Sequence, residues 1–234
     1  LDEFCSQIEV RIDHFSQFLT SNTNPSIVGN ILSLFVRLLN SSSAIESFKQ
    51  AQLVPRLLGL IHTNGNSPIQ GLCVHIVVYL LDDYDITRHT TRILLKPLLC
   101  LLNEPHPMED KSLVIRLCHM MKRLLNETPQ SIGGVVHCHV LLCLDQLLTG
   151  YDADTDLLDV VLDLITRCCS QESDYDMAAS GLMERVKKGL RELIKTHNVS
   201  MVVKGLQTCE KIMSQCELTR MTMMTEEWLK LIIA

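Results

Sequence analysis

The segment HCHVLLC carries the side chains most typical of a zinc site. His139 and Cys143 lie four residues apart, so on a helix both would project from one face and could share a metal ion. His137 and Cys138 complete the segment, but His137 and His139 would project from nearly opposite sides of that helix. A zinc site takes three or four ligands, and no second pair follows at ligand spacing. We therefore expect Cys143 in the core and His139 at the surface.

Four aspartates imitate a calcium-binding loop. They occupy the first, third, fifth and twelfth positions of such a loop: Asp152, Asp154, Asp156 and Asp163. The sixth position must be glycine for the sharp turn, and here it is Leu157, which opens the apolar run LLDVVLDL. We expect these aspartates to cap a helix and to complement the positive charge at its N-terminus. The sequence thus predicts no metal and no cofactor.

Catalytic motifs are missing from the sequence. No G-x-S-x-G, phosphate-binding loop, H-E-x-x-H or paired-cysteine zinc motif occurs. Nothing places a nucleophile beside an oriented base, so we expect a protein that is not an enzyme.

Charge is unevenly distributed in the C-terminal third. Residues 151–176 carry eight acids and one base, whereas residues 182–211 carry seven bases and three acids. This basic stretch could meet phosphate, an acidic partner or an anionic membrane, or it could be an ordinary solvated helix face. Its densest part, here called the basic surface, comprises Arg185, Lys187, Lys188, Arg191 and Lys195.

The elements that carry these residues are predicted to be helices throughout. Apolar residues, 47% of the 234, recur at helical spacing almost everywhere, while aromatic residues make up 4%. This composition disfavours β-sandwiches and barrels as well as a disordered chain. A net charge of −6 disfavours nucleic acid as a partner, and no apolar stretch is long enough to cross a bilayer.

A repeated pattern accompanies the helical spacing. Similar leucine-rich segments recur every 42–44 residues, at 27–39, 69–81, 112–125 and 156–169, with a weaker fifth copy at 199–213. Partner helices are predicted between them at 44–61, 87–102, 135–148 and 177–194. A helix pair that cannot bury its own apolar faces can do so by stacking on its neighbours.

The segment from residue 44 to residue 81 resembles one complete repeat of the armadillo and HEAT superfamily. In that family a short helix leads through a small turn into x-V/I-P-x-L-L, and Leu53-Val54-Pro55-Arg56-Leu57-Leu58 fills this place. The resemblance implies an all-α, right-handed α-solenoid of about five repeats that forms a single domain over 1–234. The repeats would cover 1–40, 42–82, 87–126, 135–169 and 177–216, with a capping helix over 222–234.

The resemblance also implies a protein-binding groove along the last helix of each repeat. Importin-alpha-like members carry an asparagine there, with a tryptophan four residues earlier. The asparagine position falls on Arg37, Tyr79, Arg123, Arg167 and Lys211, and the tryptophan position on Ser33, His75, His119, Asp163 and Gln207. Because both residue types are missing, basic nuclear-localisation peptides are not the expected ligand.

The residues at these positions suggest a different ligand. We call Arg37, Arg123, Arg167 and Lys211 the ladder bases. Together with His75, Tyr79 and His119 they would suit an acidic or amphipathic peptide segment of a partner protein. The alternative is that they are ordinary solvated side chains. A second functional alternative is a regulatory or targeting domain that acts through its ends and the basic stretch 182–211, contacting phosphate backbone or anionic lipid.

The ends of the chain suggest further expectations. The sequence opens on Leu1, so we expect an excerpt of a longer protein. In the C-terminal tail, Met221, Met224, Trp228, Leu231 and Ile232 are predicted to share one helical face. That face would either cap the array or allow self-association. Ten cysteines lie mostly in leucine-rich segments, which favours free thiols and an intracellular location, in cytoplasm or nucleus.

Overall fold

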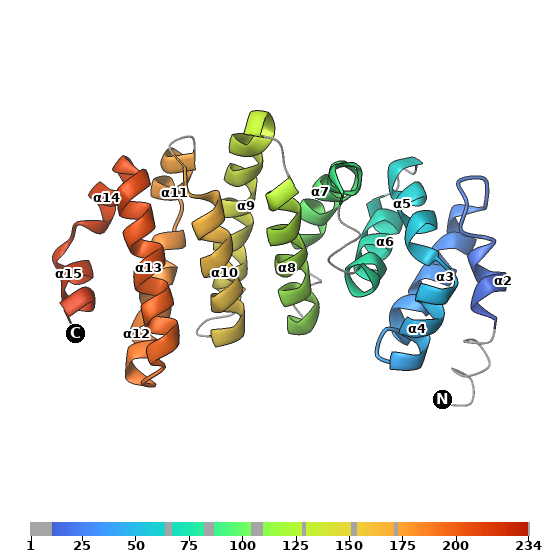
Figure 1. Cartoon of the computed structure of the whole chain (residues 1–234), viewed down its shortest axis with the longest axis horizontal. Coiled ribbons are helices and arrows are strands. Elements are labelled where there is room, and N and C mark those ends of the chain that lie inside the picture. Colours follow the sequence, from blue (N-terminus) through green and yellow to red (C-terminus); the bar gives the residue numbers. More distant parts are fainter. Residues whose placement is uncertain are drawn as a thin grey trace. The chain divides into compact units, whose positions relative to one another are not determined.

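The computed structural model describes residues 11–63, 67–81, 87–103, 110–127, 130–150, 154–170 and 173–233. Every regular element in these ranges is a helix, which confirms the all-α prediction (Figure 1). The helices are α2 (Ile12–Ser16), α3 (Pro25–Leu38), α4 (Ser42–Gln50), α5 (Leu53–Thr63), α6 (Ser67–Leu80), α7 (Arg88–Leu102), α8 (Lys111–Glu127), α9 (Gln130–Gly150), α10 (Thr155–Cys168), α11 (Asp174–Ala179), α12 (Leu182–Lys195), α13 (Val199–Gln215), α14 (Glu217–Met223) and α15 (Glu226–Ile233).

The chain forms two compact units, Leu1–Leu101 and Leu102–Ala234. In the first unit α6 packs against α3, α4 and α5. The rings of Phe35 in α3 and Phe48 in α4 lie with centroids 4.9 Å apart in its core. Helix α3 begins with Pro25, whose missing N–H would have had no intrahelical acceptor, and Asn24 caps it by accepting from the Ser26 amide at 2.9 Å.

The second unit is built from two rows of helices. One row consists of α8, α10 and α13, each packed against the next, as the labelled helices in Figure 1 show. The other row contains α9, α12 and α15, and it packs against the first through α9 on α10 and α12 on α13. The short helices α11 and α14 pack against each other and against α9 and α13, respectively.

Close approach of the rows depends on glycine, most severely at Gly205. A Cβ atom at Gly205 of α13 would lie 2.2 Å from a Leu190 methyl group of α12. Leu190 is itself buried, so it has little room to move. The absence of a side chain at Gly205 therefore lets α13 lie against α12.

Polar contacts between helices have a characteristic sequence separation. Side-chain hydrogen bonds that join different helices commonly connect residues 40–47 positions apart, in both units. Examples are Arg56–Ser16, Lys122–Asp163, Cys143–Asn103, Thr166–Thr208, Arg185–Asp145, Lys187–Glu227 and Thr219–Asp174. In these pairs, a helix therefore bonds to a segment that lies a similar distance away along the chain.

Two interpretations of the C-terminal third are wrong. The helix predicted over 177–194 is interrupted, because α11 ends at Ala179 and α12 begins only after Ser180 and Gly181. The tail does not form one apolar face either, because α14 ends at Met223 and α15 begins at Glu226. Met221 consequently remains 69% exposed while Trp228 is 1% exposed, in the helix that packs against α12. Ile232 lies outside the described side chains.

The local expectations for the two metal-like segments are confirmed for Cys143, His139 and Asp154, but not for Asp163, which lies in the middle of α10 rather than at its N-terminus. Cys143 is buried and donates from its Sγ to Asn103 Oδ1 at 3.1 Å, whereas His139 is exposed. Asp154 caps α10, its Oδ1 accepting from the amides of Asp156 at 3.1 Å and Leu157 at 3.0 Å. Asp152 and the Cys138 side chain lie outside the described residues.

Candidate binding surface

The α8–α10–α13 row leaves one polar stripe uncovered. Helix α10 is buried on most sides because α8, α9 and α13 all pack against it. Asp159, Asp163 and Arg167, spaced four residues apart, form the stripe that its neighbours leave in contact with solvent. The candidate surface is therefore the side of α10 that α8, α9 and α13 do not cover.

Charges of opposite sign alternate across the middle of this stripe. Lys122 Nζ of α8 lies 2.5 Å from Asp163 Oδ2, and Lys204 Nζ of α13 lies 2.8 Å from Asp163 Oδ1. Lys204 also bonds Asp159 Oδ1 at 2.7 Å. Partial burial raises the pKa of Asp163, but the hydrogen bonds from Lys122 and Lys204 outweigh it and hold that pKa below its ordinary value. The middle of the row is thus an ion-pair network with little net charge.

Two ladder bases of this unit, Arg167 and Lys211, lie at one end of the same stripe and bond to backbone. Arg167 Nη2 donates to the Leu125 carbonyl at 3.2 Å, and Lys211 Nζ donates to the Thr166 carbonyl at 2.8 Å. Both acceptors belong to the last turn of the preceding helix, where carbonyls lack an intrahelical partner and carry partial negative charge. Each base therefore caps the C-terminus of its neighbour in the row.

This capping gives the shared register a structural cause that sequence reasoning missed. Arg123, half-buried, precedes the acceptor Leu125 by two residues, so it lies on the same turn of α8 that Arg167 reaches. Arg56 makes the equivalent bond in the first unit, donating from Nη1 to the Ser16 carbonyl at the end of α2 at 2.9 Å. The sequence does contain a pattern that could have predicted these bonds, namely a basic residue about 42 positions after the end of an earlier helix.

The remaining predicted residues are divided between the two units. Arg37 is exposed in the last turn of α3, and His75 and Tyr79 are half-buried on the adjacent helix α6, with ring centroids 5.8 Å apart. His119 is exposed on α8, one turn before Arg123. The structure thus places Arg37, His75 and Tyr79 in the first unit and the other predicted residues in the second.

The basic surface on α12 is extensively paired with acids. Arg185 Nε lies 2.7 Å from Asp145 Oδ1 of α9, and Lys195 Nζ lies 2.6 Å from Glu192 Oε1. Lys187 is only 5% exposed, and its Nζ lies 2.6 Å from a Glu184 oxygen. Lys188 is exposed.

Glu227 of α15 joins two of these bases. Its Oε2 lies 3.1 Å from Lys187 Nζ and 3.2 Å from Arg191 Nη2. The Lys187 ammonium also lies 5.8 Å from the centroid of the Trp228 ring. The positive charge counted in the sequence is therefore offset by carboxylates, two of which come from other helices.

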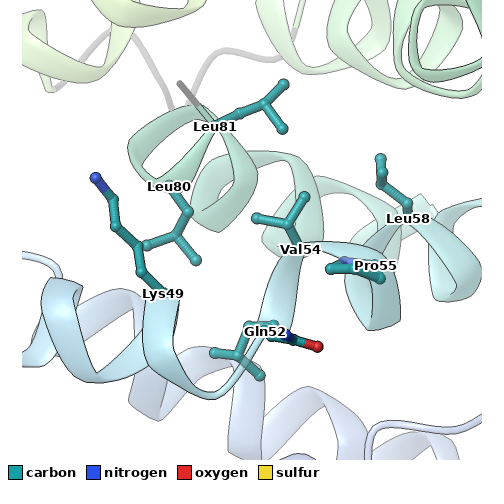
Figure 2. Close-up of a pocket in the computed structure, with 8 residues that line it drawn as sticks. Lys49, Gln52, Val54, Pro55, Leu58, Leu80 and Leu81 are labelled. Carbon is teal, nitrogen blue, oxygen red and sulfur yellow. The ribbon is translucent and has the colours of Figure 1, made fainter. Parts of the chain in front are cut away.

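A pocket of about 440 Å³ lies in the first unit, where sequence reasoning placed no site (Figure 2). It lies between the α4–α5 turn, where Gln52 has a positive φ of 48°, and the C-terminal end of α6. Its lining is mainly apolar, and Figure 2 shows Lys49 and Gln52 as its labelled polar residues. The lining residues are Lys49, Gln52, Leu53, Val54, Pro55, Leu58, Leu80 and Leu81. They include no acid, thiol or hydroxyl for catalysis.

Two further observations bear on function. Among the described residues, no cluster of three or more histidine, cysteine or acidic side chains has the geometry to hold a metal ion. Within the same part of the chain, no helix is both long and apolar enough to traverse a membrane.

No protein-family model, no curated protein and no solved structure matches this chain.

Proposed function

We propose that this chain is an armadillo/HEAT-like α-solenoid that acts inside the cell as a non-enzymatic protein-interaction scaffold. Its ligand is an acidic or amphipathic peptide segment of a partner protein. In the second unit such a segment meets His119, Arg123, Arg167 and Lys211, and in the first unit a segment of the same kind meets Arg37, His75 and Tyr79. The successive packing of α8, α10 and α13 and the 40–47-residue separation of interhelical hydrogen bonds support the solenoid part of this proposal.

One observation carries the binding role. Arg167 is exposed, yet its guanidinium is held in place by the Leu125 carbonyl. That bond uses one of five N–H donors, so the others remain able to bind a carboxylate. A cation that is already positioned loses less side-chain entropy when a ligand binds. The Arg167 site is thus preorganised for an acidic side chain.

The row geometry predicts the spacing of acids in the ligand. Neighbouring packed helices lie about 8–10 Å apart, so the base on one helix is roughly that far from the base on the next. A peptide in the extended polyproline II conformation rises about 3.1 Å per residue with three residues per turn, so acidic side chains three residues apart project from one side and lie about 9 Å apart. The proposed ligand is therefore an extended segment with acids at every third position.

We leave the α12 basic surface out of the binding site. Arg185, Lys187, Arg191 and Lys195 each have a carboxylate partner within 3.2 Å. A phosphate or lipid headgroup would have to displace those partners before it could bind these cations.

Fluorescence anisotropy with labelled peptides tests the proposal. A peptide with glutamate at every third position should bind the wild-type chain, while a peptide of the same composition with its glutamates clustered at one end should bind more weakly. The charge-reversed variant Arg123→Glu/Arg167→Glu should bind the first peptide roughly tenfold or more weakly, because two cations become anions.

The matched control is Arg220→Glu/Lys230→Glu, which makes the same change in net charge. Both bases are exposed and pair within their own helices, to Glu217 and Glu226. This variant should bind the peptide as the wild type does. Equal affinity of the ladder variant and the wild type, with unchanged helical circular dichroism, would contradict the proposal.

A further inference from the structure

Two buried thiols meet where the first row of the second unit joins the C-terminal helices. Cys169 Sγ and Cys216 Sγ lie 3.3 Å apart, and the two residues are 7% and 1% exposed. Cys169 is the C-cap of α10, and Cys216 is at once the C-cap of α13 and the N-cap of α14. This sulfur contact therefore touches the ends of three helices.

We propose that Cys169 and Cys216 are a redox-convertible pair that closes to a disulfide between α10 and the α13–α14 junction. The proposal goes beyond the scaffold function and does not depend on it. Disulfide sulfurs lie about 2.05 Å apart, so the two atoms need to approach by only ~1.3 Å.

The backbone on both sides of the contact is already fastened in a compatible position. Cys216 Sγ lies 3.5 Å from the Ser170 carbonyl, next to Cys169 in sequence. The Asp174 carboxylate accepts from the amides of Leu218 at 2.8 Å and Thr219 at 2.9 Å, which ties α14 to α11. The two cysteines thus meet through positions that other bonds define.

The reaction requires an oxidant, and a low-molecular-weight disulfide such as oxidised glutathione supplies it. The Cys169 thiolate, the more exposed of the two, attacks one glutathione sulfur, forms a mixed disulfide and releases one glutathione thiolate. The Cys216 thiolate then attacks the Cys169 sulfur and releases the second glutathione thiolate. Two protein thiols are oxidised and one glutathione disulfide is reduced to two thiols.

Burial makes this exchange slow in the folded state. Burial, and then the hydrogen bond that the Cys169 thiol shares with Cys216, raise the pKa of Cys169 to about 12, so little thiolate is present at neutral pH. The pair therefore holds whichever redox state it had when the chain folded, until the region opens. Once formed, the bond closes a loop between residues 47 positions apart and should raise the thermal unfolding midpoint by several degrees.

Oxidative refolding of the full chain tests the proposal, because the thiols are accessible before folding. The denatured, reduced chain is refolded in buffers of graded reduced-to-oxidised glutathione ratio, free thiols are alkylated, and the unreduced protein is digested with trypsin. The expected product joins peptide 168–185 to peptide 212–220, with the loss of two hydrogen atoms. Fragmentation should assign the bond to Cys169 and Cys216.

Alanine variants separate this pair from its neighbours. Cys168→Ala, at a residue that is adjacent in sequence and also buried, should retain the cross-link and its effect on the unfolding midpoint. Cys169→Ala and Cys216→Ala should each lose both. A folded wild-type product with alkylated Cys216 in the most oxidising buffer, or with Cys216 joined to Cys168 or Cys209, would overturn the proposal.

Discussion

The ladder bases of the α8–α10–α13 row and the bases of α12 differ in what they bond to. On the row, Arg167 and Lys211 donate to backbone carbonyls at helix ends. On α12, Arg185 and Lys187 pair with carboxylates. A carbonyl carries only partial negative charge, so the first arrangement fixes a cation and leaves most of its charge, whereas the second neutralises it. Basic residues that look alike in the sequence therefore produce surfaces of different electrostatic character.

Bonds from charged side chains to helix ends should matter more for stability than ion pairs between exposed side chains. Asp174 gives the largest effect, because it is 7% exposed and bonds the Leu218 and Thr219 amides and the Thr219 hydroxyl. Asp174→Ala would leave buried donors unsatisfied and should lower the free energy of unfolding by about 2–4 kcal/mol. Urea unfolding monitored by circular dichroism measures it, with Asp176→Ala on the same helix as the control. Equal losses in the two variants would argue against a helix-end role.

Arg167→Ala should have an intermediate effect. The substitution removes a cap from the last turn of α8, and we expect a loss of about 0.5–1.5 kcal/mol in the free energy of unfolding. Arg167→Lys keeps the charge and should recover part of that loss. If the Lys variant is as unstable as the Ala variant, charge at the helix end is not what stabilises the row.

Acid should weaken the ion-pair network in the middle of the row. The pKa of Asp163 is lowered in the folded state, against burial, by its bonds to Lys122 and Lys204. Its contribution is thus fully present above the unfolded value near 3.8 and declines as pH falls below that value towards the folded pKa. Asp163→Asn should therefore lose less stability than the wild type as the pH falls below about 4. Parallel pH profiles of the two proteins would contradict this assignment.

Arg191→Ala should have the smallest effect. Arg191 and Glu227 are both substantially exposed, so water and salt screen their attraction. We expect the thermal unfolding midpoint to stay unchanged within error at physiological salt. A clear destabilisation that persists in molar salt would show that the α12 pairs contribute as much as the helix-end bonds.

The sequence was sufficient for most helices because their signal is local. Apolar spacing placed helices at 112–125 and 156–169, close to the observed α8 and α10. It failed at Ser180-Gly181 and at Met224-Thr225, where short breaks interrupt an otherwise continuous apolar pattern. Breaks of two residues change the direction of the chain without changing its composition.

The partners of the charged side chains could not be predicted in the same way. The position of Arg167 could be inferred from repeat register, but its acceptor, the Leu125 carbonyl, depends on how α10 packs against α8. Similarly, the sequence pattern places Arg185 and Lys187 on an exposed basic face. In the folded chain they pair with Asp145 and Glu227, each 40 residues away. Pairing of this kind depends on tertiary packing, which single-helix patterns do not encode.

The recurring 40–47-residue separation of many interhelical hydrogen bonds has a kinetic consequence. The loops that must close to form these bonds have similar lengths, so the entropic penalty of closing them is similar from one bond to the next. Relative contact order then falls as a chain of this kind grows longer. Such a chain can fold outward from any stable helix pair, and its folding speed is set by the nucleating pair rather than by total length.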